Sequence, residues 1–358
     1  MIRILPKSNG IGPGNVQNFR APGAIVILGI LLELVSPAAR GQEFRTSPFV
    51  LRNHSPFSAI IGTPSRWPDG TTNIAELSWN VSNHSFFDDN GSESLQLDGE
   101  THTLSARLQY RLSQHIQLGV DIPWLAHSGG FLDGTIDGWH ELIGFSEGIR
   151  PHMPRNELQH VLEIAGTEKF RLDNSVSGIG DIRFAIAFDL GNPNASPNAA
   201  YLKRIPWTLT LSMEAPTGKI EKLTGNDSAD LAAGLGIRSP KTAGGRIHWW
   251  LDMGLVWPGD VDIDGLDTAG QIYYYDAAFA WRFQRRFDFL LQVAGNTAPY
   301  QSNIKMLGDP AAQVAIGGLW HLSSHYGLRF GIIEDLRAKT APDVGFELTL
   351  IFGIPGRN

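Results

Sequence analysis

The chain has 358 residues, a formal net charge of −7, 40 glycines, 10 tryptophans and no cysteine. Charged residues make up 18% of the sequence, below the roughly 25% of an average soluble protein. The lack of cysteine excludes disulfides and cysteine-based metal sites, and the lack of a basic run argues against a nucleic-acid partner. A mean hydropathy of −0.11 without a long apolar core segment favours a β-barrel over a helical membrane protein.

The only sustained apolar run covers residues 24–32. It is too short to cross a membrane as a helix, but it suits the hydrophobic part of a signal peptide. Positive residues precede it, and a small-x-small sequence after it predicts cleavage behind Gly41, with Ala38 as the alternative. We therefore expect residues 1–41 to be a signal peptide, with the true start of translation downstream of Met1. An uncleaved N-terminal anchor is the alternative.

Residues 42–72 contain several prolines and little alternation, which predicts irregular backbone before the first strand. The segment is either a periplasmic leader or a plug that folds into the barrel. The apolar pieces around Phe49 and Phe57 favour a segment that packs against something.

The stretch from Leu104 to Trp124 shows the unit that the rest of the chain repeats. Apolar and polar residues alternate over 104–112 and again over 116–124, with a short polar turn at 113–115. A period of two predicts β-strands with one apolar face, and the short turn predicts an antiparallel hairpin. Each strand has about the ten residues that a tilted strand needs to cross a bilayer.

The same alternation predicts about twelve strands in all, an even number as single-chain bacterial barrels have. They cover residues 73–82, 104–112, 116–124, 180–190, 207–214, 231–237, 247–257, 273–283, 287–293, 314–322, 326–332 and 344–352. The predicted fold is all-β, a transmembrane antiparallel up-and-down barrel over residues 73–352. Phe352 resembles the C-terminal signal that the barrel-insertion machinery recognises, although a tail over residues 353–358 follows it.

The lengths of the connections predict how the barrel is oriented. The turns after the second, eighth and tenth strands are short, and the connections after the odd-numbered strands are long, including the polar segment 84–99. Short periplasmic turns and long external loops are typical of outer-membrane barrels. Aromatic residues near strand ends resemble interfacial girdles: Trp79, Trp124, Trp207, Trp257, Phe283, Trp320, Tyr326 and Phe352. A secreted soluble β protein, with its apolar face inward, is the alternative.

An outward apolar face places the polar face in the lumen, where charges of both signs occur. The predicted pore-lining residues are Arg107, Arg111, Asp121, Asp181, Arg183, Glu214, Asp252, Asp276, Arg282 and Arg329. These side chains either line a polar pore with a transverse field or pair across the lumen and leave little open channel.

The longest connection, residues 127–177, is the predicted external loop. Trp139, Leu142 and Ile143 have helical spacing, so a short helix there would bury its apolar face in the lumen and constrict the pore. The loop residues singled out for specificity are Asp133, Asp137, Trp139, His140, Glu141 and Arg150. The acidic residues and His140 lack calcium-loop or zinc spacing, so we expect no metal and no cofactor.

Several of these segments carry a family resemblance. Residues 49–56, the turn at 98–100 and residues 129–150 resemble an uncharacterised family of Gram-negative outer-membrane β-barrel proteins, domain of unknown function 3187. Residues 178–181, 215–218 and 228–230 are more loosely similar to barrels linked to the uptake of aromatic compounds. Neither resemblance implies catalytic residues.

The predicted function is therefore an outer-membrane channel or facilitator for small solutes, including hydrophobic or aromatic ones. A non-conducting structural or surface-interaction barrel with an occluded lumen is the second hypothesis. An outer-membrane lipid hydrolase is the third, because His321 and Ser323 share one face of a strand, but no third catalytic residue or nucleophile elbow accompanies them. The expected partners are outer-membrane lipid, the insertion machinery and a small solute, and the expected state is a monomer.

Overall fold

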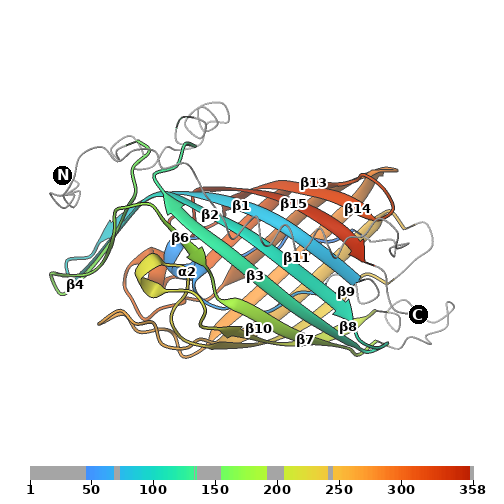
Figure 1. The fold of residues 1–358 in the computed structure, drawn as a ribbon, viewed down its shortest axis with the longest axis horizontal. Helices are drawn as coiled ribbons and strands as arrows, with labels where there is room; N and C mark the ends of the chain where they lie inside the picture. The colour runs from blue at the N-terminus through green and yellow to red at the C-terminus, as the bar shows by residue number, and fades with distance from the viewer. Residues whose placement is uncertain are drawn as a thin grey trace.

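The computed structural model describes residues 46–67, 73–132, 134, 155–191, 205–240 and 245–354. These residues form an elongated barrel of tilted strands with very little helix (Figure 1). The helical pieces are α2 (Pro56–Ala59), the 3-10 turn η3 (Ile220–Lys222) and α4 (Lys305–Gly308). In the described part of the chain, no helix has the length and apolar character needed to cross a membrane.

The described strands form one sheet of fifteen, and twelve of them close into a ring because β1 pairs with both β2 and β15. Neighbouring strands of the ring are antiparallel throughout, as in an up-and-down barrel. In chain order the ring consists of β1 (Asn73–Asp89), β2 (Glu93–Arg111), β3 (Ile116–Ser128), β7 (Ile182–Asp189), β8 (Trp207–Ala215), β9 (Asp230–Arg238), β10 (Ile247–Trp257), β11 (Ile272–Gln284), β12 (Phe287–Asn296), β13 (Ala311–His321), β14 (Tyr326–Asp335) and β15 (Val344–Ile354).

Three further strands extend the sheet at one end of the barrel. β4 (Gln159–Ile164) pairs with the first residues of β2, and β5 (Thr167–Leu172) pairs with β4. β6 (Val176–Ile179) pairs with the last residues of β3. The segment 127–177, expected to be one long loop, therefore contains β4, β5 and part of β6. These strands are only four to six residues long, too short for their alternation to be recognised in the sequence.

The ring strands confirm the predicted barrel of about twelve strands. The predicted loop over residues 84–99 is wrong, because β1 and β2 stay paired as far as Asp89 and Ser94. Their turn is only Asn90 to Ser92, held by the Asn90 side chain, whose Oδ1 accepts the N–H groups of Ser92 and Glu93. β15 also continues to Ile354, two residues beyond the predicted end.

The outer face of the ring is apolar and the inner face is polar. On β1, Trp79 points outward and is 40% exposed, whereas Glu76, Ser78 and Asn80 are buried inside. The same alternation holds on other strands, and the large outward residues include Phe184, Leu211, Leu231, Leu251, Met253, Phe279, Trp281, Ile316, Phe330 and Leu348. An exposed apolar band around a closed barrel fits lipid, and it contradicts the alternative of a soluble barrel with its apolar face inward.

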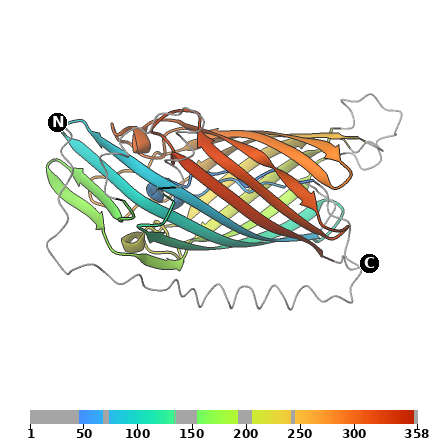
Figure 2. The same cartoon turned by 90° about the horizontal axis from the view of Figure 1, so that it is seen from above.

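The two ends of the barrel differ. At one end, here the short-turn end, only a few residues join β2 to β3, β11 to β12 and β13 to β14. At the other, the long-loop end, several connections gather (Figure 2). Their buried apolar side chains, together with some from α2 and neighbouring strands, form a cluster that we call the cap. The cap includes Phe57, Ile60, Leu95, Leu162, Ile220, Leu223, Val261, Ile263, Leu266, Ile304, Met306 and Leu307.

Because the outer face is apolar, we predict that a charged substitution there lowers the stability of the barrel more near the bilayer midplane than near the barrel rim. Leu251 lies midway along β10 and is 47% exposed on the outer face. Leu251→Arg is expected to destabilise the barrel in lipid vesicles by about 2–4 kcal/mol, because the guanidinium would sit near the bilayer midplane. Leu112→Arg, at the short-turn end, is the matched control and should cost no more than about 1 kcal/mol. Equal losses in urea unfolding titrations would contradict this placement.

Candidate functional site

The lumen is occupied by the chain's own N-terminal residues 46–67, which we call the inner segment (Figures 1 and 2). Thr46 lies beside Asp288 near the short-turn end of β12, and α2 reaches the cap. The backbone then returns, so that the Trp67 ring contacts Gly119 near the start of β3. Both ends of the segment therefore lie toward the short-turn end, where β1 begins.

The wall makes room for the apolar side chains of the inner segment. A Cβ atom added at Gly331 would lie 2.6 Å from the Phe49 ring, and one added at Gly254 would lie 2.3 Å from Pro64 Cγ. Because such distances are shorter than van der Waals contact, only glycine fits at these positions. The inner segment is thus seated in a surface shaped to hold it.

Hydrogen bonds join the inner segment to one strand and to two connections of the barrel. The Gly62 N–H donates to Asp230 Oδ2 at 2.6 Å, and Tyr300 Oη donates to the Phe57 carbonyl at 2.6 Å. Asn53 Nδ2 donates to the Thr340 carbonyl at 2.9 Å, in the connection before β15. These partners come from β9 and two long-loop connections, so the segment is hydrogen-bonded to parts of the barrel that are far apart in the sequence.

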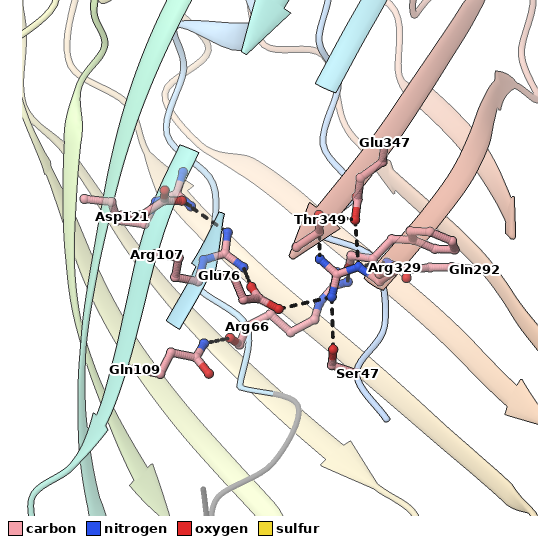
Figure 3. A network of polar contacts seen from close by, with 12 residues as sticks. Ser47, Arg66, Glu76, Arg107, Gln109, Asp121, Gln292, Arg329, Glu347 and Thr349 are labelled. Carbon is pink, nitrogen blue, oxygen red and sulfur yellow. Dashed lines mark hydrogen bonds and ion pairs between the residues drawn. The ribbon is translucent and has the colours of Figure 1, made fainter. Parts of the chain in front are cut away.

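A chain of alternating charges crosses one half of the inner wall (Figure 3). Arg329 joins Glu347 at 2.6 Å to Glu76 at 3.1 Å, and Arg107 joins the same Glu76 at 3.2 Å to Asp121 at 3.1 Å. Arg183 then joins Asp121 at 3.8 Å to Glu214. We call this the ion-pair belt. Its members, in the order of the neighbouring strands β14, β15, β1, β2, β3, β7 and β8, are Arg329, Glu347, Glu76, Arg107, Asp121, Arg183 and Glu214.

The ion-pair belt is incomplete without the inner segment. The belt has four carboxylates and three guanidinium groups. The inner segment adds Arg52, whose guanidinium interacts electrostatically with Glu214 and Asp121 and donates to the Ala59 and Ile61 carbonyls. It also adds the Ser47 hydroxyl, 3.0 Å from Arg329 Nη1. Charges buried this deeply persist only where they are paired and hydrogen-bonded.

The opposite half of the wall is bridged by the inner segment directly. Arg66 Nη2 lies 2.7 Å from Asp276 Oδ2, and Arg66 Nε lies 3.5 Å from Asp252 Oδ2. The Arg66 carbonyl accepts a hydrogen bond from Gln109 Nε2 at 3.0 Å (Figure 3). One arginine therefore links β10 and β11 to β2 across the lumen.

The structure brings most of the predicted pore-lining residues into the lumen. Arg107, Asp121, Arg183, Glu214 and Arg329 form the belt, and Asp252 and Asp276 bind Arg66. Asp181 accepts the N–H groups of Gly218 and Asn226 and so orders the connection between β8 and β9. Arg282 pairs with Asp288 near the short-turn end.

Arg111 is placed differently. It lies at the last residue of β2, where Nε donates to the Ser113 carbonyl at 2.9 Å and Nη2 to the Gln114 carbonyl at 3.0 Å. It caps a turn at the barrel rim, because the strand ends there and the turn carbonyls are the nearest acceptors. The predicted external-loop residues Asp133, Asp137, Trp139, His140, Glu141 and Arg150 lie outside the described residues.

His321 and Ser323 have separate partners. His321 Nε2 lies 2.7 Å from Asp288 Oδ2, whereas Ser323 Oγ accepts the N–H groups of His325 and Tyr326, each at 3.1 Å. The imidazole belongs to the charge cluster around Asp288 and the hydroxyl orders the turn before β14. The geometry of a nucleophile beside its base is not present between these two side chains.

Sequence reasoning missed the arginines of the inner segment. Arg52 and Arg66 lie in proline-rich, irregular sequence, where no periodicity indicates which way a side chain points. Their signal was only compositional: two arginines and several apolar residues in a segment that otherwise resembles a leader.

A cavity remains beside the inner segment, and the atom-free space in it, open solvent included, is about 1180 Å³. Its lining combines charged groups with aromatic rings and small residues. These include Arg66, Arg107, Asp121, Arg183, Arg238, Asp252 and Asp276, together with Trp67, Trp250, Tyr274, Thr208, Thr210, Gly234 and Gly236. The inner segment therefore does not fill the lumen completely.

Three imidazoles meet near the cap. Thr101 Oγ1 lies 2.9 Å from both His84 Nε2 and His127 Nδ1, and the His160 ring packs edge-on against both rings. Burial lowers the pKa of His160 to about 3, so this ring is neutral at pH 7. Among the described residues, no group of three or more His, Cys, Asp or Glu side chains is arranged to hold a metal ion.

Comparisons with known proteins agree with the family resemblance seen in the sequence. A family model described as "Protein of unknown function (DUF3187)" matches residues 25–354. No curated protein matches the chain. Among solved structures, the COG4313 outer membrane channel from Pseudomonas putida F1 aligns with a TM-score of 0.48 and 12% identity, over 78% of this chain and 94% of that one.

Two other solved structures align more weakly. The NanC porin has a TM-score of 0.42 and 5% identity, over 79% of this chain and 99% of that one. The Pseudomonas putida toluene transporter TodX has a TM-score of 0.37 and 11% identity, over 84% of this chain and 95% of that one.

The ion-pair belt predicts a large cost for removing its most buried cation. Arg329 is fully buried, so Arg329→Met would leave Glu76 and Glu347 short of a partner and should destabilise the barrel by about 3–5 kcal/mol. Arg337→Met breaks an exposed pair with Asp309 and should cost less than about 1 kcal/mol. Urea unfolding in vesicles measures both. A loss below about 1 kcal/mol for Arg329→Met would show that the belt is hydrated rather than buried.

Proposed function

Because the chain belongs to a family of proteins of unknown function (DUF3187), its role must be argued from the barrel itself, and we propose that it is an outer-membrane channel for small solutes, held closed by the inner segment. The observation that carries this proposal is the cavity left beside that segment, which charged and aromatic residues line together. A barrel with a purely structural role has no need of an unfilled lumen lined by both charged and aromatic groups.

The placement of the inner segment supports a gate rather than a permanent filling. Both of its ends lie toward the short-turn end, so it can leave the lumen there without unthreading any strand. If the short turns face the periplasm, as in other outer-membrane barrels, and residues 1–41 are removed as a signal peptide, the segment begins close to a free end in the periplasm.

The cap closes the opposite end. Its buried apolar side chains come from several long connections and from α2 of the inner segment. Because Phe57, Ile60 and Ile61 belong to this cluster, withdrawal of the inner segment would remove part of the cap's own core. Movement of one segment would then loosen both closures, which is what a channel that opens along its full length requires.

The aromatic residues of the cavity lining indicate which class of solute it would bind. Trp67, Trp250 and Tyr274 present rings to the cavity, and such rings bind the flat apolar surface of an organic solute. We therefore include small molecules with aromatic or apolar parts among the solutes. A non-conducting barrel is the second candidate, and the close seating of Phe49 and Pro64 on wall glycines is the observation that favours it.

A reversible disulfide between the inner segment and the wall tests whether the segment must move for solutes to pass. The chain has no cysteine, and a Cβ atom added at Gly234 would lie 3.4 Å from Pro64 Cβ, near the lower end of the disulfide range of about 3.5–4.5 Å. The Thr210 hydroxyl must rotate to admit it. In planar bilayers, the Pro64→Cys/Gly234→Cys variant should show discrete conductance steps when reduced and none when oxidised.

Each single cysteine variant, treated with the same oxidant, is the control and should keep its conductance. Equal conductance in the oxidised and reduced double variant would show that solutes pass without movement of the inner segment. Absence of conductance in both states, with folding verified by heat-modifiable gel mobility, would establish the non-conducting barrel instead.

A further inference from the structure

Two carboxylates face each other directly across strands β10 and β11. Asp252 and Asp276 are register partners, and both line the cavity. Like charges placed opposite one another in a sheet repel, so a cation between them stabilises this pair. That cation is the guanidinium of Arg66, which lies 2.7 Å from Asp276 and 3.5 Å from Asp252.

The other arginines of the cavity wall are already matched by wall carboxylates. Arg107 pairs with Glu76 and Asp121, and Arg183 pairs with Glu214. Arg238 bonds to Asp189 at 3.3 Å and to the Thr208 hydroxyl at 2.7 Å. These pairs stay intact if the inner segment moves.

The Asp252–Asp276 pair is the exception. Among the described residues, its ion pairs are with Arg66 alone, and Gln292 adds one neutral hydrogen bond to Asp276 at 2.7 Å. When the inner segment leaves, these two carboxylates lose their ion-pair partner, and only the longer-range attraction of Arg238 for Asp252 remains. Asp121 and Glu214 lose Arg52 in the same movement but keep ion pairs to wall arginines.

The surroundings of the pair suit an organic cation. Asp276 is 6% exposed, and its Oδ1 atom has no hydrogen-bond partner within the described part of the chain, so the carboxylate retains acceptor capacity. Trp250, Trp67 and Tyr274 line the same cavity. The faces of such rings attract cations, most strongly where water is excluded. Carboxylates beside aromatic rings form a site for a guanidinium or ammonium group rather than for an anion.

We propose that Asp252 and Asp276 form the solute-binding subsite of the channel, specific for the guanidinium or ammonium group of a small organic cation. Arg66 occupies this subsite in the closed state as an internal substitute for the solute. The assignment deepens the proposed function and rests on it where it calls the bound molecule a transported solute. A cationic solute that displaces Arg66 would also release the inner segment, so that binding and opening would be coupled.

Binding of agmatine, a small dication with a guanidinium and an ammonium group, tests the subsite without requiring conduction. The Arg66→Met variant, which keeps apolar packing but removes the charge, should bind agmatine in detergent solution about tenfold or more tightly than the unchanged chain, because Arg66 no longer competes. Calorimetry and the fluorescence of Trp67 and Trp250 report the binding. Glutarate, an anion of similar size, should show no such gain.

Neutralising the acids is the matched control. Arg66→Met combined with Asp252→Asn and Asp276→Asn should lose the gain, while Arg66→Met with Asp260→Asn, an acid outside the cavity lining, should keep it. If Arg66→Met does not fold, Arg66→Lys is the second variant. It keeps a cation but cannot contact Asp252 and Asp276 with two separate nitrogens of a guanidinium group. It should bind agmatine more tightly than the unchanged chain, by a smaller factor than Arg66→Met.

Two results would overturn the subsite: agmatine binding that Arg66→Met and Arg66→Lys both leave unchanged, or a gain that survives loss of both acids. Other results would contradict the channel proposal without contradicting the subsite. If agmatine binds as expected but no state of the Pro64→Cys/Gly234→Cys variant conducts, the pair is a cation site in a non-conducting barrel. If the channel conducts and agmatine does not bind, the gate stands and the subsite is wrong.

Discussion

The structure depends on one constraint: a closed barrel with an apolar outer face must bury its polar residues inside itself. Outward positions such as Trp79, Leu251 and Phe279 are exposed. The residues that alternate with the outward ones point their polar and charged side chains into the lumen. Buried charges are tolerated only as satisfied pairs. The ion-pair belt is the result, and it runs from Glu347 to Glu214 across neighbouring strands so that nearly every carboxylate shares a guanidinium with the next strand.

The inner segment completes this arrangement. Arg52 adds a cation beside Glu214 and Asp121, Arg66 bridges Asp252 and Asp276, and Ser47 and Thr46 supply hydroxyls to Arg329 and Asp288. Wall glycines at 254 and 331 receive Pro64 and Phe49. The barrel wall and its filling are therefore complementary in charge and in shape, and neither is electrostatically balanced alone.

This complementarity has a consequence for opening. An inner segment that leaves the lumen exchanges its ion pairs for water, and the wall carboxylates that it covered need new partners. Water entering the barrel supplies part of that compensation, and a cationic solute at Asp252 and Asp276 would supply the rest. The cap loses Phe57, Ile60 and Ile61 in the same movement, so charge and apolar packing both link the two ends of the barrel.

Local alternation predicted the barrel because its signal needs no long-range information. A period of two along residues 104–124 shows which side chains share a face, and the exclusion of nucleic-acid and cysteine chemistry follows from composition alone. The same pattern placed Arg107, Asp121, Arg183, Glu214 and Arg329 on the inner face, although it could not show which of them touch. It also failed at strand ends, where Arg111 turns to nearby carbonyls.

The sequence by itself determined the class of fold, the approximate number of ring strands and which residues of each strand share a face, since these follow from the identity of alternate residues. The exposed apolar side chains of the closed ring then showed which of the two faces is outward. Only the tertiary structure decided what fills the lumen and how the charges pair. Residues 46–67 have no period to indicate their orientation, and β4 and β5 extend the sheet outward from β2, with β4 paired to β2 and β5 paired to β4. Contacts such as Arg66 with Asp276, more than two hundred positions apart, arise when the ring closes, because closure alone brings distant strands around one interior.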